Sequence, residues 1–263
     1  MRNPMDSEVN NTLPTIGLQL YTVRDALSQN PSATLKELSE IGYKYVEIAD
    51  TSNYPLSQFT SLLSEYNLSA LSTHIDYLVL LQSSEYIIQE IKKSGLKYVV
   101  VPWIGPEVWQ DVSLAENVIS AMDNIGKSFA DEGIFLCYHN HAHEIRKTTE
   151  IGVLDLLLER AEKVYLELDL GWGYVATGEN PFKLVEKYGH RIKLFHLKDV
   201  SKRDPVKFTE LGMGEIPWVE ILPEIWKLNK SPWIVEQDDN FSINSISSAK
   251  VGIETLRAIL KRL

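Results

Sequence analysis

The chain has little that could support a disulfide framework, a membrane span or binding to a polyanion. Its one cysteine, Cys137, excludes an internal disulfide, and the apolar context FLCYH favours a buried structural thiol. No apolar run is long enough to cross a bilayer. Lysine and arginine total 26 against 36 acidic residues, and a net charge of −10 argues against a general nucleic-acid binder. We therefore expect a cytoplasmic protein without a membrane or nucleic-acid partner.

Short β-rich runs recur along the sequence, with amphipathic stretches between them. This alternation is typical of a parallel sheet built from βαβ units, and 263 residues suit one barrel of such units. The predicted strands cover residues 15–22, 44–49, 68–74, 97–103, 134–141, 163–170, 191–197 and 232–237. Eight strands predict closure into a (β/α)8 TIM barrel.

The segments between the strands have the apolar spacing of helices. In 32–42, Leu35, Leu38 and Ile41 recur at helical intervals, and Gly42 suits a C-terminal cap. Similar patterns occupy 56–66, 151–161 and 243–263, the last of which is expected to close the barrel. The first residues are rich in Asn, Pro and charge and have no apolar stretch of signal-peptide length. We predict a flexible leader over 1–13 and a single-domain barrel over 14–263.

Metal-binding residue types stand where four consecutive predicted strands end. In barrels of this kind, functional side chains lie at the carboxyl ends of the strands. Crowded imidazoles and carboxylates there would be costly to bury without a cation. Mixed nitrogen and oxygen ligands suit Mn, Zn, Co or Fe better than Ca, and Mg is compatible. The predicted ligands of one divalent ion are His139, Asp169, His196 and Glu236.

Side-chain alternation places further groups on the inner face of the same strands. If His139 and Asp169 point inward, Cys137 and Glu167 point inward as well. Glu167 would then lie one layer below the ion, where a carboxylate can fix the tautomer of a ligating histidine. A buried ion pair of Glu167 with Lys198 or an arginine is the alternative.

Several motifs together resemble the xylose isomerase-like TIM barrel superfamily, also described as sugar phosphate isomerases/epimerases. The resemblance runs through nearly the whole chain after residue 14, in IGLQLYTVRD, YVEIAD, FLCYHNH, LELDLGW, LFHLKD, LGMGEIPW and IVEQDD. It implies one metal ligand from each of strands five to eight, at the four positions named above. It also implies a departure, because ketose 3-epimerases of this family have a glutamate at the position of His139.

The departure leaves two enzymatic hypotheses. The leading one is a metal-dependent isomerase or epimerase that removes a proton beside the carbonyl of a keto-sugar or sugar phosphate. The alternative is a lyase or hydrolase of 3-keto-glycosides or a keto-polyol dehydratase, since neutral imidazole makes the site more positive and removes one base. In both, Glu236 is ligand and candidate base, with Lys198, His74 and Glu47 as further acid/base candidates. Lys198 could instead pair with Asp169 or Asp199, and Glu47 could be purely structural.

The remaining strand-end residues are candidates for sugar binding. Tyr21, Trp103 and Trp172 could stack on a sugar ring or simply pack at the rim. Polar contacts are expected from Gln19, Arg24 and His141, although Arg24 could equally form a capping salt bridge.

Two readings from other classes remain open, as does the oligomeric state. A non-catalytic sugar-binding barrel would keep the fold without turnover, and an abasic-site endonuclease would need more metal ligands and a less acidic surface. The exposed helices of barrels are compatible with a homodimer.

Overall fold

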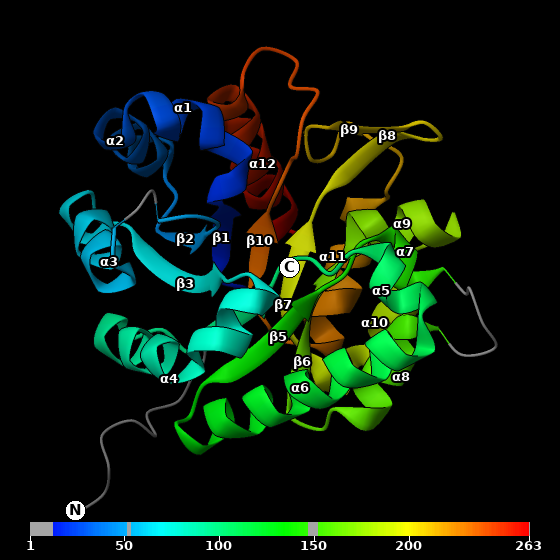
Figure 1. Cartoon of the computed structure of the whole chain (residues 1–263). Coiled ribbons are helices and arrows are strands. Elements are labelled where there is room, and N and C mark those ends of the chain that lie inside the picture. The colour runs from blue at the N-terminus through cyan, green and yellow to red at the C-terminus, as the bar shows by residue number, and fades with distance from the viewer. Residues whose placement is uncertain (1–12, 52–53, 147–151, 263) are drawn as a thin grey trace, which may run out of the picture.

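The computed structural model describes residues 13–51, 54–146 and 152–262. Eight parallel strands form a closed barrel in the order β1-β10-β7-β6-β5-β4-β3-β2, with helices around the outside (Figure 1). The predicted TIM barrel is confirmed. The barrel strands are β1 (Ile16–Gln19), β2 (Tyr45–Ile48), β3 (Ser69–His74), β4 (Tyr98–Val101), β5 (Phe135–His139), β6 (Val164–Asp169), β7 (Ile192–Leu197) and β10 (Trp233–Val235).

All eight predicted strands are present, but the first is shorter than expected. The Gln19 side chain accepts a hydrogen bond from the Tyr21 backbone N–H at 3.0 Å, which turns the chain into a 3₁₀ helix, η1 (Leu20–Val23). The structure also adds a two-stranded antiparallel hairpin after β7, formed by β8 (Asp199–Arg203) and β9 (Val206–Thr209). Figure 1 shows this hairpin projecting beyond the barrel, on the side away from α4 and α6.

The helices have ordinary local signals at their ends. In α2, Asn30 caps the N-terminus by accepting from the Ala33 N–H, Pro31 takes the first position, and Gly42 ends the helix at a φ of 106°. The helices are α1 (Arg24–Gln29), α2 (Pro31–Ile41), α3 (Leu56–Glu65), α4 (Tyr77–Ser94), α5 (Pro106–Gln110), α6 (Val112–Asp131), α7 (Ala142–Ile145), α8 (Val153–Arg160), α9 (Leu170–Thr177), α10 (Phe182–Tyr188), η2 (Gly189–Arg191), α11 (Trp218–Leu228) and α12 (Ser245–Leu260).

Helix α12 closes the barrel as predicted. It packs beside β10, where Gly252 lies so near Val235 that a side chain would meet its Cγ1 at 2.7 Å. The Tyr43 hydroxyl donates to the Ala249 carbonyl at 2.8 Å and ties this helix to the chain before β2. Residues 1–12 of the predicted leader lie outside the described residues.

The barrel interior has an apolar lower layer and a polar upper layer. The lower layer is a separate cluster of Val100, Cys137, Leu194 and Ile234, from four different strands. Cys137 is fully buried there, as the sequence predicted. The larger core lies between the strands and the surrounding helices. Within the part of the chain that the structure describes, no helix combines the length and apolarity needed to span a membrane. The polar layer above this apolar floor forms the candidate site.

Candidate active site and metal centre

The four predicted metal ligands meet at the carboxyl ends of β5, β6, β7 and β10. One possible ligand atom from each of His139, Asp169, His196 and Glu236 lies within 4.8 Å of the other three, and all four residues are buried. The His196 Nδ1 lies 2.9 Å from Glu236 Oε2, and the His139 Nε2 lies 3.8 Å from Asp169 Oδ2. The sequence therefore identified a set of residues that could hold a divalent ion.

Asp169 is oriented so that one of its oxygens faces the other predicted ligands. Its Oδ1 accepts from the Trp172 N–H at 2.7 Å, while its buried Oδ2 lies 3.3 Å from Lys198 Nζ and 3.8 Å from His139 Nε2. The side chain of Asn140 fixes the backbone of Asp169 on both sides, by accepting from its N–H and donating to its carbonyl. The Lys198 ammonium offsets part of the negative charge on this buried oxygen, and an ion bound beside His139 would offset more of it.

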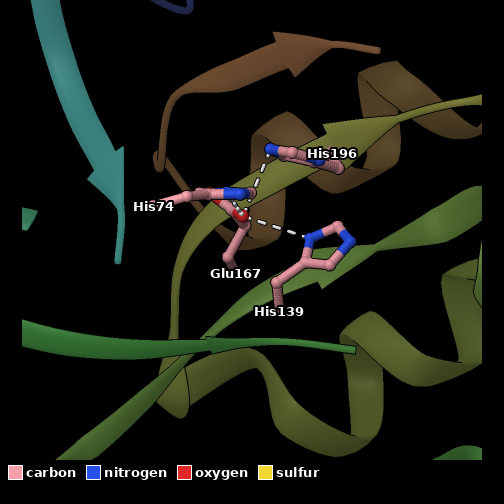
Figure 2. A group of neighbouring side chains, drawn as sticks. All are labelled: His74, His139, Glu167 and His196. Atoms are coloured by element: carbon pink, nitrogen blue, oxygen red, sulfur yellow. Dashed lines mark hydrogen bonds and ion pairs between the residues drawn. The ribbon is translucent and has the colours of Figure 1, made fainter. Parts of the chain in front are cut away.

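A second group of possible ligands lies directly beneath, and it shares two histidines with the first. His74, His139 and His196 converge on Glu167, as Figure 2 shows. Glu167 Oε2 lies 2.9 Å from His74 Nε2, 3.1 Å from His139 Nδ1 and 3.2 Å from His196 Nε2. The prediction that Glu167 contacts His139 from below is confirmed, and its contacts are with histidines rather than with Lys198.

The two groups use opposite nitrogens of the shared histidines. In the lower group His139 presents Nδ1 and His196 presents Nε2, whereas the upper carboxylates face His139 Nε2 and His196 Nδ1. A neutral imidazole has one N–H and one lone pair. If the lower nitrogens donate to carboxylates, the upper nitrogens carry the lone pairs that a metal requires. The upper group therefore suits the ion, and the lower group suits the role of fixing the tautomers.

The lower group of possible ligands, around Glu167, continues into Glu47 and Gln19. Neither residue is among those that line the cavity above. Glu47 Oε1 accepts from Gln19 Nε2 at 2.7 Å and lies 2.6 Å from His196 Nε2, and Ser72 donates to its other oxygen. Burial alone would raise the pKa of Glu47, but the neighbouring imidazoles hold it well below the usual value. Glu47 and Gln19 are thus placed as supports of the histidines, beneath the position where a substrate would reach.

His74 belongs to the lower group and also reaches the cavity. Burial alone would lower its pKa, but the carboxylates of Glu47 and Glu167 raise the pKa to about 10. Its ring lines the cavity above and stacks on His196 with centroids 5.7 Å apart. A charged His74 offsets the two buried carboxylates beneath the ion site.

A cavity of about 370 Å³ opens above the predicted ligands. This is within the usual size range of small-molecule sites. Its lining residues come from both sides of the barrel and include three of the six predicted substrate contacts, Tyr21, Trp103 and His141. The lining residues are Tyr21, Ala49, His74, Pro102, Trp103, His139, His141, Lys198, Glu236 and Asp238.

Lys198 is held at the cavity by three carboxylates. Its Nζ lies 2.8 Å from Glu236, 2.9 Å from Asp238 and 3.3 Å from Asp169. Burial alone would lower the pKa of Lys198, but these acids raise it well above its usual value. Lys198 is therefore a positively charged ammonium at the cavity. Its ion pair with Asp169 is the one predicted as an alternative from the sequence.

Asp238 is a cavity residue that the sequence reasoning missed. It follows Glu236 by two positions in IVEQDD, so alternation along an extended chain could have placed both carboxylates on one face. Asp199, the other proposed partner of Lys198, instead accepts from the backbone of Val200, Gly212 and Gly214. The loop Gly212–Gly214 after β9 therefore donates its backbone N–H groups to the Asp199 carboxylate.

Aromatic rings form one wall of the site. His141 lies between Trp103 and Trp172, with centroid distances of 4.5 and 5.2 Å. Burial, followed by the charge of Lys198, lowers the pKa of His141 to about 3. His141 is therefore a neutral imidazole at the cavity wall, beside the Trp103 indole, which is 47% exposed.

Tyr21 and Arg24 lie at the opposite rim. The Arg24 guanidinium stacks over the Tyr21 ring at 4.0 Å and donates to the backbone carbonyls of Tyr21 and Asp238. Arg24 borders a smaller side cavity of about 200 Å³ rather than the central one. These hydrogen bonds connect η1 to the segment after β10. Arg24 therefore has a structural role, like that of the predicted capping salt bridge, rather than an anion-binding one.

Replacing Glu167 by glutamine tests the tautomer-fixing layer. The variant keeps the shape but weakens the acceptor beneath His139 and His196, so we expect metal affinity to fall by about 10–100-fold. Competition with a chromogenic chelator measures this affinity. The exposed Glu162 provides the matched control as Glu162→Gln, which should bind the ion like the wild type. Equal affinity in the two variants would contradict the assigned role.

Metal binding should weaken in mild acid because of Asp169. Burial raises the pKa of this carboxyl to about 6, although Lys198 opposes the shift. A raised pKa means that Asp169 is protonated and neutral below that pH, so the ion must displace a proton there. We expect the affinity to fall about fivefold between pH 6 and pH 5, and to approach a tenfold loss per pH unit below that. Calorimetric titration from about pH 5 to 7 measures this, and an affinity independent of pH would refute it.

The comparisons with known proteins agree with the barrel. The sequence profile described as xylose isomerase-like TIM barrel matches residues 35–259. An inosose dehydratase of Clostridium botulinum (strain Alaska E43 / Type E3) is 33% identical over 144 residues, which cover 47% of each chain. An inosose dehydratase of Geobacillus kaustophilus (strain HTA426) is 25% identical over 277 residues, which cover 88% of this chain and 85% of the relative. The chain thus spans about half of the first relative and most of the second.

Two solved structures show the same fold. A sugar phosphate isomerase/epimerase from Parabacteroides distasonis ATCC 8503 superposes with a TM-score of 0.74, at 20% identity and 98% coverage of both chains. A xylose isomerase-like TIM barrel protein from Mycobacterium smegmatis, in complex with magnesium, gives a TM-score of 0.71 at 16% identity, covering 96% of this chain and 98% of that one.

Proposed function

The chain belongs to the xylose isomerase-like TIM barrel family, and from this premise we propose that it is a metal-dependent lyase that eliminates water from a neutral keto-polyol or keto-sugar. This reverses the order of the two hypotheses drawn from the sequence, in which an isomerase or epimerase came first. The placement of the carboxylates around the cavity is the observation that supports the reversal.

The carboxylates that line the cavity belong to one side of the barrel. Glu236 and Asp238 both follow β10, and in the strand order β10 lies across the barrel from β4. The facing lining residues are Pro102 and Trp103 after β4, with His139 and His141 of the neighbouring β5 segment. A two-base epimerisation uses a carboxylate on each side of the sugar. Among the described lining residues, the facing side has imidazoles and an indole in that place.

The reaction can be written with this chain's own groups. Glu236, whose pKa is lowered by Lys198 and His196 against the effect of burial, is an ionised carboxylate that can take the proton from the carbon beside the ketone. The electron pair left behind forms a carbon–carbon double bond and expels the hydroxyl of the next carbon. The Lys198 ammonium, 2.8 Å from Glu236, can donate the proton that turns this hydroxyl into water. A base and an acid on the same side favour elimination.

An ion held by His139, Asp169, His196 and Glu236 would supply Lewis acidity that polarises the ketone. His139 in place of a carboxylate leaves such a site one unit more positive. The neutral His141 and the exposed rings of Trp103 and Tyr21 would hold the hydroxyls and the apolar face of the substrate. The relatives named inosose dehydratase support the same reaction class, because dehydration is an elimination.

An isomerase or epimerase remains the second candidate function. The neutral imidazole of His141 lies on the side of the cavity that faces Glu236, where it could accept a proton from the opposite face of the substrate. The structural likeness to a sugar phosphate isomerase/epimerase supports the same possibility.

Proton NMR in D₂O separates the candidates. The metal-loaded protein is incubated with a keto-cyclitol, a free ketohexose and a 3-keto-glycoside. The lyase is expected to consume a substrate and produce an unsaturated ketone, whereas the second candidate would produce an epimer or isomer with solvent deuterium. Lack of any exchange or product across the panel would support a non-catalytic sugar-binding barrel and refute both enzymatic proposals.

A further inference from the structure

The hairpin β8–β9 begins directly after Lys198 and returns to it. Asp199, the next residue, opens β8, and Phe208 lies on the returning strand β9, paired with Val200. The centroid of the Phe208 ring is 5.3 Å from the Lys198 Nζ, and Phe208 is only 5% exposed. The hairpin therefore brings one of its own side chains back onto the lysine that precedes it.

A second aromatic ring contacts the same ammonium. The Trp172 ring, near the start of α9, has its centroid 5.4 Å from the Lys198 Nζ. It meets the Phe208 ring edge to face, at a centroid distance of 5.1 Å. A cation within about 6 Å of a ring centroid is attracted by the electrons of the ring. Lys198 is therefore held by two rings as well as by its three carboxylates.

The Phe208 ring is itself fixed by contacts that do not involve the lysine. It packs in an apolar cluster with Ala142 of α7 and Val175 of α9. The Asn240 side chain donates to the Phe208 carbonyl at 2.8 Å, which ties β9 to the segment after β10. That segment also supplies the carboxylates of the cavity. Phe208 is thus a firm support against which a flexible side chain can rest.

A lysine needs such support if it is to act on one particular atom. Its four-carbon stem is flexible, and three carboxylates attract the Lys198 Nζ from 2.8 to 3.3 Å away. A misplacement of about 1 Å in an active site can cost about 100-fold in rate. Among the described residues that line the central cavity, neither Phe208 nor Trp172 appears. Both rings would therefore act on a substrate only through the lysine.

We propose that Phe208 is a positioning residue for the elimination, with its ring holding the Lys198 ammonium beside Glu236, where the lysine can protonate the leaving hydroxyl. The proposal rests on the proposed function, because Lys198 is the acid of that reaction. It gives the hairpin β8–β9, which is an addition to the eight-stranded barrel, the task of placing the acid.

Replacing the ring by an aliphatic side chain tests this role. We expect Phe208→Leu to lower kcat on the best substrate of the NMR panel by at least about tenfold, with KM within about threefold of the wild type. Metal affinity should be unchanged, because Phe208 is not a predicted ligand. Phe208→Tyr retains the ring and should keep kcat within about threefold of the wild type.

Val206→Ala is the matched control, because Val206 also lies on β9 and packs against the same apolar cluster. It weakens the packing of the hairpin without removing a ring, so kcat should stay within about twofold of the wild type. Wild-type kcat in Phe208→Leu would overturn the positioning role. A Phe208→Tyr or Val206→Ala variant as slow as Phe208→Leu would overturn it as well.

NMR of the lysine keeps the inference testable if no keto-sugar is turned over. The protein contains lysine that is isotope-labelled at Cε, and it is loaded with Zn²⁺, which does not broaden the signals. The two Hε protons of Lys198, assigned by their loss in Lys198→Met, should have separate shifts because the side chain is held beside two rings. We expect them to merge into one averaged signal in Phe208→Leu and to stay separate in Val206→Ala.

The two measurements together distinguish failure of the reaction from failure of the inference. Absence of turnover together with the merged Hε signal in Phe208→Leu would refute the proposed reaction and leave the hold of Phe208 on Lys198 standing. Separate Hε signals in Phe208→Leu would overturn the positioning role, even in a protein that turns the substrate over.

Discussion

Asp169→Ala is expected to remove the bound ion and nearly all activity. Its buried Oδ2 lies among the predicted ligands, 3.8 Å from His139 Nε2, and its Oδ1 caps α9. Loss of a group that only orients a ligand costs about 10–100-fold, so loss of the ligand itself should cost at least that much. Metal content by atomic emission and initial rates on the best substrate of the NMR panel measure both effects in one preparation.

Two further variants test whether this loss of activity is due to loss of the ion. Asp131→Ala changes an exposed aspartate at the end of α6 and should retain the ion and the rate of the wild type. Asp169→Asn keeps the acceptor that caps α9 while removing the charge, so it should fold like the wild type and still lose the ion. A metal-free Asp169→Asn protein with wild-type activity would show that the ion has no part in the chemistry.

Lys198→Met is expected to retain the ion and to lower kcat by about 10²–10³-fold. The ammonium is buried between Glu236, Asp238 and Asp169, and it is the group proposed to protonate the leaving hydroxyl. Methionine preserves the length of the side chain and removes its charge. Because a nearby cation is lost, metal affinity should stay equal or rise.

Lys198→Arg distinguishes proton donation from charge alone. Arginine keeps the positive charge but does not release its proton, so kcat should remain low if Lys198 is the acid. Recovery to near the wild-type rate would restrict the lysine to an electrostatic role. Lys202→Met, on the exposed hairpin strand β8, is the control and should leave both rate and metal affinity unchanged.

The eight strands and the metal ligands were predictable because one rule governs both. Apolar runs bounded by polar turns mark the strands, and in a closed parallel barrel their last residues must meet at one end. His139, Asp169, His196 and Glu236 could therefore be grouped before any coordinates were known.

The layer beneath the ion was harder to assign, because it depends on which nitrogen of each histidine faces which carboxylate. Alternation showed that Glu167 points inward, but Glu47 and Gln19 had been placed among catalytic and substrate-binding candidates. Their burial beneath the histidines follows from barrel stagger, which one sequence does not reveal.

The hairpin β8–β9 was not predicted at all. It lies between two barrel strands, and the conformation of such connections depends on contacts between distant segments. Asp238 belongs to the same class, although the alternation in IVEQDD gave a usable signal.

Titration of metal-free protein with Mn²⁺ tests the central claim most directly, with binding and turnover followed in the same samples. The geometry predicts that activity is absent before addition, rises linearly and reaches its plateau at about one equivalent per chain, because each shared histidine has one lone pair to offer. Full activity of the metal-free protein, or a plateau that requires two equivalents, would contradict it.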